Sequence, residues 1–555
     1  MEHDVRTLRG RRADQRWNRV SVGDLLERVT WSTPDKVALV GCEGAYSDAR
    51  FHRVTYSEGD QIANQIAHAL LAEGLEPGSR ILLYCDNSVE AMLTMIGIAK
   101  AGMVAVPVNP LLAPDVLKWA MGHAEISLAI VDAGLFPRVA ETFREFGLHP
   151  RVSIALDAGP VKDTSSFGDW IDGQPKTEVG VSVHGDDVWA LVFTSGTTSM
   201  PKASMMTHTY SYMSSFAYAM SLTRGLKHET DLVACTFMPI IYHCGHNSTP
   251  LPAFISGGTI VLGRRPDAVK LAAAVTQERV TAAWLGSPMW VEKLIEVAEQ
   301  DSRGVDLSSL CVAMFAWGAM RPDISERLDR ICGEQVQMLE VFGQTEAMSC
   351  FRFWPGRSPE KHQESIRGVN HVGVPNPLLA ADIHDAEGNS LRGKPGIPGE
   401  AVYRSPVITA GYYKDEQATA EAFRDGWFHS GDSCVFTEDG TQIMVDRFKD
   451  IVKSGGENVS SMRVEGVLSG HPAVERVAVI GLEDEKWGEV VTAVVVARKN
   501  TKVDESELIA YSREHLAGFE APKRVIVIDD MPATVGGKIM KFRLREMINA
   551  AVNPT

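Results

Sequence analysis

The chain has 555 residues, of which 45% are hydrophobic and 23% charged, and its formal net charge is −16 at pH 7. This length and hydrophobic share predict roughly three or four domain-sized units with sizeable cores. The acidic balance argues against a nucleic-acid binder, which needs a basic face. It leaves anionic small ligands open, because local cations and backbone N–H groups bind those.

Three further features indicate a cytoplasmic protein. The eight cysteines are scattered, without a C-x-x-C pair or zinc-ligand spacing, as is typical of a reducing compartment. The N-terminal residues are charged and lack the apolar segment of a signal peptide. The most apolar stretch, residues 91–108, is interrupted by Lys100, so we expect a buried helix and a strand rather than a membrane span. We expect a monomer or a homodimer.

Helical stretches and short apolar runs alternate along most of the chain. The first cycles are a helix over 56–75, a strand over 79–85 and a strand over 104–108. The alternation resumes later with strands over 257–263, 281–286 and 310–318 and helices over 267–280 and 288–300. Such alternation with short turns predicts an α/β architecture with largely buried sheets.

The composition of the sequence changes near Gly373. Residues 373–413 are rich in Gly and Pro with short apolar strands, which predicts a small β unit. After about residue 459 helices and strands alternate again for about 100 residues, enough for a separate small domain. We therefore predict an N-terminal domain over 1–448 and a small C-terminal α+β domain over 449–555, with the boundary near Lys449.

The stretch FTSGTTSMPKASMMTH, residues 193–208, follows the apolar run WALVF. A Gly/Ser/Thr turn after a strand exposes backbone N–H groups and hydroxyls that can hold phosphate oxygens, and Lys202 adds a point charge. The alternative is a flexible surface linker, which fits less well because a buried strand precedes it and Pro201 stiffens the turn. The Walker pattern is absent, so a P-loop NTPase does not fit.

This stretch resembles the phosphate loop of the adenylate-forming enzymes, which include acyl-CoA synthetases, standalone adenylation domains and luciferases. That family usually has Gly where Ser199 and Ala203 stand. The resemblance implies that the loop cradles the β- and γ-phosphates of ATP. The residues it assigns to this role are Thr194, Ser195, Gly196, Thr197, Thr198 and Lys202.

Two segments resemble the family's adenine and metal motifs. In VFGQTEAM, the resemblance implies that Phe342 stacks on adenine, Thr345 contacts the α-phosphate region and Glu346 holds Mg²⁺. A helix N-terminus capped by the Thr is the alternative interpretation. The segment FAWGAMRP resembles the one that lines adenine and the acyl pocket. The further residues implied in nucleotide or acyl binding are Trp317, Gly318, Ala319, Met320, Gly343 and Gln344, with Trp317 either a pocket wall or plain core.

The remaining motifs also resemble those of the family. In MPIIYHCGHN, His243 matches the residue between the acyl pocket and the thiol tunnel, although a lone His is more often a core residue. GWFHSGD and DRFKD supply Asp432 for the ribose hydroxyls and Arg447 for the ribose or phosphates. The terminal motif P-x-T-x-x-G-K supplies Lys538. The hinge and the glycine-rich loop after it are implied at Lys449, Lys453, Gly455 and Gly456.

The resemblance spans residue 30 to Arg545 and implies ATP-dependent activation of a carboxylic acid, release of pyrophosphate, and transfer of the acyl group to CoA. The implied fold is two α/β sheets plus the small β unit, with a mobile C-terminal domain. The implied catalytic residues are Lys538, Glu346, Thr194 and His243. The apolar pocket segments favour a hydrophobic acid. Ser461 and Arg463 depart from the family pattern and leave the thioester step open.

Three alternatives remain. The acceptor thiol could belong to a separate carrier protein, since no carrier attachment site follows Lys538. Luciferase-like oxidation of the adenylate shares every motif. A nucleotide-sensing scaffold without turnover is disfavoured because Lys538 and Glu346 are both present.

Overall fold

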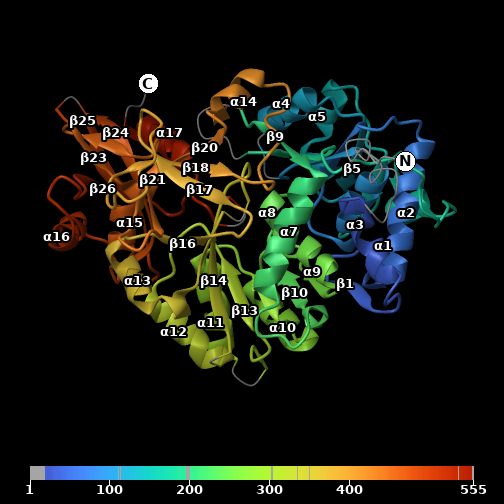
Figure 1. Ribbon diagram of the computed structural model, residues 1–555, viewed down its shortest axis with the longest axis horizontal. Coiled ribbons are helices and arrows are strands. Elements are labelled where there is room, and N and C mark those ends of the chain that lie inside the picture. The colour runs from blue at the N-terminus through green and yellow to red at the C-terminus, as the bar shows by residue number, and fades with distance from the viewer. Residues whose placement is uncertain are drawn as a thin grey trace, which may run out of the picture.

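The computed structural model describes residues 19–110, 112, 114–194, 200–301, 304–333, 335–348, 350–484, 486–534 and 537–552. Within these residues, three sheets of seven, fourteen and five strands organise the chain. The first two belong to a large N-terminal domain and the third to a smaller C-terminal domain (Figure 1). The predicted α/β class with a small α+β domain is confirmed.

The seven-stranded sheet has the order β7-β6-β5-β3-β4-β8-β9. All its neighbouring strands are parallel except the hairpin of β8 and β9. Its central strands are largely buried on both faces, as parallel strands covered by helices are. The strands are β3 (Arg80–Tyr84), β4 (Val104–Pro107), β5 (Leu128–Asp132), β6 (Val152–Ile154), β7 (Ser165–Ser166), β8 (Val188–Phe193) and β9 (Ala203–Thr207).

Helices cover both faces of this sheet. Thr55 and Glu58 form a capping box at the start of α2 (Tyr56–Ala72), and Ser88 caps α3 (Val89–Lys100). These caps satisfy backbone N–H groups that a helix start leaves unpaired. The other helices of this half are α1 (Leu25–Thr30), α4 (Pro114–Ala124), α5 (Ala140–Glu145) and α6 (Phe167–Ile171).

The fourteen-stranded sheet joins a parallel α/β part to an antiparallel extension. The parallel part consists of β1 (Val37–Gly41), β10 (Val233–Thr236), β11 (Thr259–Leu262), β12 (Ala282–Trp284), β13 (Val312–Phe315) and β14 (Gln337–Phe342), with β2 (Arg53–Thr55) antiparallel at its edge. Its helices are α7 (His208–Leu222), α8 (His243–Ser248), α9 (Pro250–Ser256), α10 (Ala268–Glu278), α11 (Pro288–Gln300) and α12 (Pro322–Cys332).

The predicted small β unit is continuous with this sheet rather than separate. Strands β15 (Phe351–Phe353) and β16 (His371–Pro375) connect it to β14 through antiparallel ladders. The unit itself consists of β17 (Ala380–His384), β18 (Gly399–Arg404), β19 (Phe423–Arg424), β20 (Trp427–Phe436) and β21 (Gln442–Arg447). Two short helices, α13 (Pro359–Glu364) and α14 (Glu416–Ala422), flank it.

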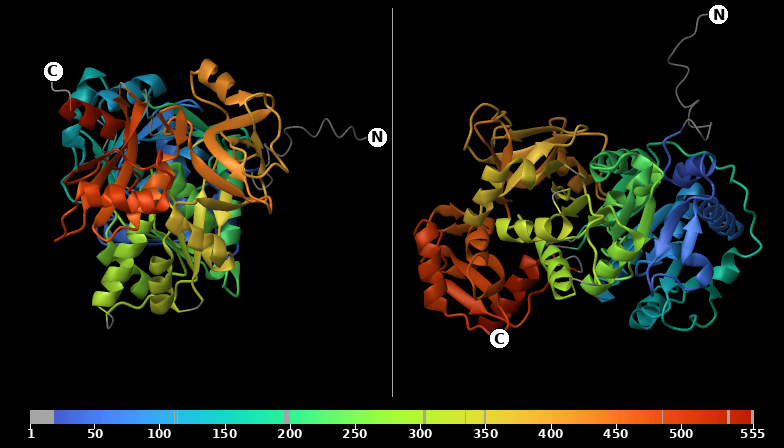
Figure 2. Two further views of the ribbon diagram at one scale, coloured as in Figure 1. Left: turned by 90° about the vertical axis from the view of Figure 1, so that its left-hand side faces the viewer. Right: turned by 90° about the horizontal axis from the view of Figure 1, so that it is seen from below.

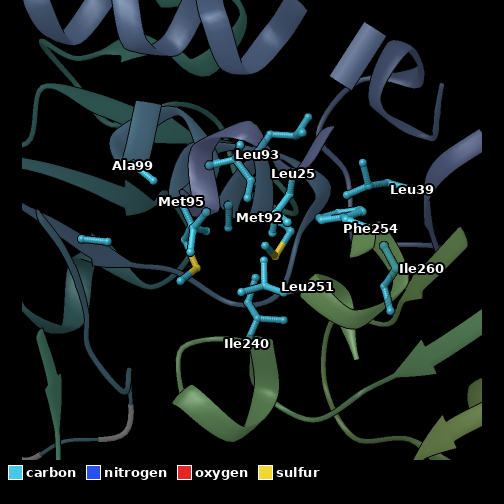
Figure 3. Packing of buried hydrophobic residues seen from close by; sticks show 14 of the residues in the cluster. Leu25, Leu39, Met92, Leu93, Met95, Ala99, Ile240, Leu251, Phe254 and Ile260 are labelled. Carbon is cyan, nitrogen blue, oxygen red and sulfur yellow. The ribbon is translucent and has the colours of Figure 1, made fainter. Parts of the chain in front are cut away.

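One hydrophobic core lies between the two large sheets and fixes how they pack. It contains side chains of β3 and β4 from the first sheet and of β12, β13 and β14 from the second. Figure 3 shows Met92 and Leu93 of α3 in this core together with Leu251 and Phe254 of α9. Burying one such side chain contributes about 1.5–3 kcal/mol, so the shared core sets the two sheets in one rigid frame.

The C-terminal domain has its own sheet and cores. Its strands are β22 (Val452–Ser454), β23 (Glu457–Val459), β24 (Val474–Asp484), β25 (Gly488–Ala497) and β26 (Arg524–Val527), and its helices are α15 (Ser461–Ser469), α16 (Glu505–His515) and α17 (Lys541–Val552). Figure 2 shows this domain, in red, at the end of the molecule opposite the blue first sheet. Among the described residues, no helix is long and apolar enough to cross a membrane.

Candidate active site

The predicted phosphate loop connects β8 to β9. At its base the Thr194 N–H donates to the Lys202 carbonyl (2.9 Å), and the Lys202 N–H donates to the Thr194 hydroxyl (3.2 Å). The predicted ligands Ser195, Gly196, Thr197 and Thr198, and also Ser199, lie outside the described residues. Ala203 is the first residue of β9, so its Cβ belongs to a strand rather than to the loop.

Tyr412 links the loop cation to the predicted metal carboxylate. The Lys202 Nζ lies 4.7 Å from the centre of the Tyr412 ring, and the Tyr412 hydroxyl donates to Glu346 Oε1 (2.8 Å). Burial and the nearby Glu346 charge raise the pKa of Tyr412, so it stays a neutral donor. No motif in the sequence points to Tyr412. Its backbone is placed because residues 410–413 hydrogen-bond to β9.

The segment after β14 holds the predicted adenine and metal residues in a turn. A pair of backbone hydrogen bonds between Gln344 and Ala347 closes this turn, so the alternative of a capped helix is wrong. The Tyr210 hydroxyl donates to the Thr345 carbonyl (3.1 Å). Gly343 is exposed and Phe342 is half-buried, which leaves the strand end accessible to a ring that stacks there.

His243 reaches this turn from the start of α8. Burial, together with the neighbouring His246, lowers the pKa of His243 to about 3, although a hydrogen bond to the Gln344 backbone opposes the shift. The side chain is therefore neutral at physiological pH. His243 is thus a buried histidine that contacts the Gln344 backbone, and its place between the acyl pocket and the thiol tunnel stays a prediction.

Asp432 and Arg447 face each other on neighbouring strands. They are register partners in β20 and β21, with Arg447 Nε 3.3 Å from Asp432 Oδ1. Asp432 is 2% exposed, and its Oδ1 has no hydrogen-bond partner among the described residues. Burial raises the pKa of Asp432, while Arg447, Lys538 and Lys449 favour its charged form. A buried carboxylate with an open acceptor can receive vicinal hydroxyl groups.

Lys538 reaches the same place from the C-terminal domain. It sits on a tight turn in which Thr534 bonds to its backbone, and the adjacent Gly537 approaches the N-terminal domain so closely that a Cβ there would lie 3.0 Å from Ser287 Oγ. Gly537 also has a φ of +91°, which L side chains rarely adopt. Glycine therefore allows the turn to dock.

The charges around Lys538 change its protonation. Repulsion from Arg447, then burial and Lys449, lower the pKa of Lys538 to about 7, while Asp432 and Asp450 act in the opposite sense. Lys538 also acts on Cys244 of α8, a thiol whose pKa burial raises to about 12 and the lysine lowers. The turn thus brings a cation between the Asp432–Arg447 pair and α8.

This pKa predicts a pH limb in the first half-reaction. Lysine loses its charge above its pKa, so kcat/KM for pyrophosphate release, which reports the free enzyme, should fall as pH rises through about 7. The limb in kcat should lie at higher pH, because bound anions favour the charged lysine. Measuring kcat/KM from about pH 5 to about pH 9 tests this. Lys538→Arg does not titrate in that range, and a limb that persists in this variant would refute the assignment.

The segment Trp317–Met320 follows β13. Trp317 is 39% exposed and packs edge-on against Trp284 at 5.5 Å between ring centres, so the interpretation of Trp317 as plain core does not fit. Its φ of +66° is unusual for a bulky side chain. The carbonyl of Met320 accepts hydrogen bonds from His362 and Ser365. Gly318 and Ala319 are half-buried between them.

The predicted hinge lysine and the glycine-rich loop lie in different places, and among these described residues only Lys449 is close enough to influence Lys538 and Asp432. Lys449 is in the turn between β21 and β22, and Lys453, Gly455 and Gly456 form the β22–β23 hairpin. In the part of the chain that the structure describes, no hydrogen bond or ion pair joins Lys453, Gly455 or Gly456 to the nucleotide residues. The structure therefore assembles Lys538 with the nucleotide residues and leaves the glycine-rich loop outside.

Ser461 and Arg463, the two residues that depart from the family pattern, have partners in the structure. The Ser461 backbone N–H and hydroxyl both donate to Asp446 Oδ2 (2.6 Å each), and Lys541 donates to the Ser461 hydroxyl. Arg463 Nε lies 2.9 Å from Glu520 Oε1. In this arrangement Ser461 and Arg463 form hydrogen bonds and an ion pair with these neighbours and not with the predicted nucleotide-binding residues.

Comparison with known proteins identifies the family to which the chain belongs. The model of the AMP-binding enzymes matches residues 26–413, and that of the AMP-binding enzyme C-terminal domain matches residues 463–538. The chain belongs to the AMP-binding enzyme family. A feruloyl-CoA synthase from Amycolatopsis sp is 33% identical over 89% of this chain and 93% of that protein. A medium-chain fatty-acid–CoA ligase from Escherichia coli is 29% identical over 96% of this chain and 91% of that protein.

A solved structure shares the fold of this AMP-binding enzyme over almost its whole length. The anthranilate CoA ligase AuaEII, in complex with anthranoyl-AMP, superposes with a TM-score of 0.83 at 24% identity and covers 96% of this chain and 98% of its own. The curated relatives described above are CoA ligases. The expected membership of the adenylate-forming enzymes is therefore confirmed.

Proposed function

We propose that this enzyme activates a hydrophobic carboxylic acid with ATP and transfers the acyl group to the CoA thiol. The observation that carries the proposal is the meeting of Lys538 with Asp432 and Arg447 across the domain boundary. Two anions, a carboxylate and a triphosphate, must approach each other in the first step, and a cation between their sites lowers the cost of that approach.

Each named residue has a role in this scheme. The carboxylate oxygen of the acid attacks the α-phosphorus, and pyrophosphate leaves toward Thr194 and Lys202. Asp432 accepts the ribose hydroxyls, and Phe342 offers its ring to adenine. Lys538 stabilises the charge that develops between the carboxylate and the α-phosphate. His243, neutral and buried, borders the acyl group and the path of the thiol.

Glu346 fits the role of a Mg²⁺ ligand. Only its Oε1 accepts the Tyr412 hydroxyl, and Mg²⁺ is commonly held by one or two carboxylates together with substrate phosphates. When bound, the ion neutralises phosphate charge. Tyr412 orients the carboxylate and keeps Lys202 beside it, so it is a positioning residue for both charges.

The proposed substrate class rests on the wall of the acyl pocket. Trp284 is buried, Trp317 packs against it with an exposed face, and no acidic residue for a substrate amine occurs among residues 284–290 and 315–320. A flat, apolar wall suits an aromatic or other hydrophobic acid. The relative that acts on a feruloyl group supports an aromatic acid, and the fatty-acid ligase supports an aliphatic one.

Trp317→Gly should widen the pocket without straining the chain. Glycine adopts the observed φ of +66° freely, and it removes the indole face. We expect kcat/KM for bulky acids relative to small acids to rise by about tenfold or more. Pyrophosphate release with benzoate, cinnamate and long-chain acids measures this ratio. Trp31→Ala, which removes an indole that is 83% exposed just after α1, is the control. An unchanged ratio would show that Trp317 does not bound the acyl group.

Two measurements test the proposed function. Pyrophosphate release across a panel of acids identifies the acid, and thioester formation with CoA or with a carrier protein identifies the acceptor. The proposal fails if no acid supports pyrophosphate release. Adenylate formation with transfer only to a carrier protein would favour the second candidate, a standalone adenylation enzyme, for which the departures at Ser461 and Arg463 are the supporting observation.

A further inference from the structure

A second pocket lies on other elements of the N-terminal domain. It has a volume of about 230 Å³ and is bordered by the end of α7, by β15 and β16, and by residues 354–361. Its wall carries three guanidinium groups, Arg224, Arg352 and Arg357, and we call it the arginine pocket. None of its lining residues is among those assigned to the nucleotide or the acyl group.

Arg352 is a buried cation without a counter-ion. It is 6% exposed, and its Nη2 donates to the Ala217 carbonyl of α7 (2.8 Å). Its Nε has no hydrogen-bond partner, and no carboxylate of the described residues lies within ion-pair distance of it. A buried charge without a partner is costly. We therefore expect an unpaired buried arginine to be retained only where a ligand pairs with it.

The other two arginines increase this charge rather than relieve it. Arg224 lies over the Trp354 ring, 4.2 Å from its centre, and the structure shows no carboxylate paired with Arg224 or Arg357 in the described chain. Burial and then repulsion from Arg357 lower the pKa of Arg224, and burial lowers that of Arg352, with Arg224 adding to the effect. The three cations are thus within electrostatic reach of one another.

The acidic groups nearby are already engaged. Lys361 Nζ pairs with Asp439 Oδ2 at 2.6 Å, and His371 Nε2 pairs with Glu364 Oε2 at 2.7 Å. The lining itself contains no Asp or Glu. The three guanidinium groups therefore leave an uncompensated positive charge that opens onto a cavity with an aromatic wall formed by Phe353 and Trp354.

We propose that the arginine pocket binds a phosphate-type oxyanion with two negative charges. Guanidinium forks match the oxygens of such an anion and form short, charge-assisted hydrogen bonds. A dianion neutralises this cluster better than a single carboxylate does. The volume admits a phosphate group with a small substituent but not a whole nucleotide. The proposal rests on these residues alone and does not depend on the proposed function.

Calorimetric titration with inorganic phosphate tests the pocket. Mg-ATP is kept at saturation and carboxylic acid is left out, so that the nucleotide site is filled and no turnover occurs. We expect one phosphate site that weakens with added salt. Arg224→Gln and Arg357→Gln, which change partly exposed side chains, should each weaken it by about tenfold or more. Arg404→Gln is the matched control, because Arg404 also lies over a tryptophan, 4.0 Å from the Trp427 ring centre.

A competition experiment distinguishes the possible sources of the bound phosphate group. Displacement of inorganic phosphate by CoA but not by 3′-dephospho-CoA would assign the pocket to the 3′-phosphate of CoA. Displacement by neither would assign it to a free phosphate, and both results support the pocket. No phosphate binding by the unaltered protein, equal binding by Arg224→Gln and Arg357→Gln, or equally tight binding of acetate would overturn the proposal.

Discussion

Replacing Lys538 by alanine is expected to lower the rate of acyl-adenylate formation by about 10²- to 10³-fold, the cost of removing one well-placed donor to a developing charge. Transfer from preformed adenylate to CoA should stay largely intact. The physical reason is position: the turn that carries Lys538 docks against Ser287 beside Asp432 and Arg447, where the two anions react. The thiol step involves no such approach of anions.

The two half-reactions are measured separately. Pyrophosphate release with ATP and acid reports the first, and thioester formation from synthetic acyl-adenylate reports the second. Lys499→Ala is the matched control, because it removes an exposed lysine from the same domain. Equal losses in both half-reactions would show that Lys538 maintains the fold or the thiol site rather than the first transition state.

Replacing Lys449 by proline is expected to separate the two steps in the opposite way. Lys449 lies in the turn between β21 of the large sheet and β22 of the C-terminal domain, and it is not among the residues with positive φ. Proline fixes φ near −65° and restricts the preceding residue as well, so it limits rotation at this turn. Adenylation should remain, while overall thioester formation should fall by about a hundredfold, as it does when reacting groups are misplaced.

Lys449→Ala is the control for this experiment. It removes the same charge but leaves the backbone free, so it should retain more of the overall rate than the proline variant. Pyrophosphate release and thioester formation are measured with the same acid in all three proteins. A full overall rate in Lys449→Pro would mean that the domain does not rotate at this residue between the two steps.

Local patterns predicted the elements of this chain better than their connections. Apolar periodicity was enough for α2, α3 and strands such as β3, β4, β11, β12 and β13, because each of these elements is long or apolar enough to show its buried face. It could not show that β16 attaches the β unit to the second sheet through β21, since that ladder pairs His371 with Ile443, far along the chain. Strand pairs of this kind are specified by packing rather than by composition.

The same limit applies to the site. Motif residues such as Lys202, Glu346 and Lys538 were predicted because they sit in short patterns with recognisable chemistry. Tyr412 was not, because a single tyrosine in a turn carries no pattern, and its role depends on pairing between residues 410–413 and β9. Arg352 was missed for a related reason, since its unpaired state appears only once α7 lies against β15.

The repulsion between Lys538 and the Arg447–Lys449 pair has a consequence for the order of events. A charge that is hard to keep on the docked lysine is, by thermodynamic linkage, a charge that opposes docking. We therefore expect the C-terminal domain to dock less firmly before substrates bind. Bound triphosphate and carboxylate would offset this repulsion, so we expect substrate anions to favour docking and the departure of pyrophosphate to weaken it.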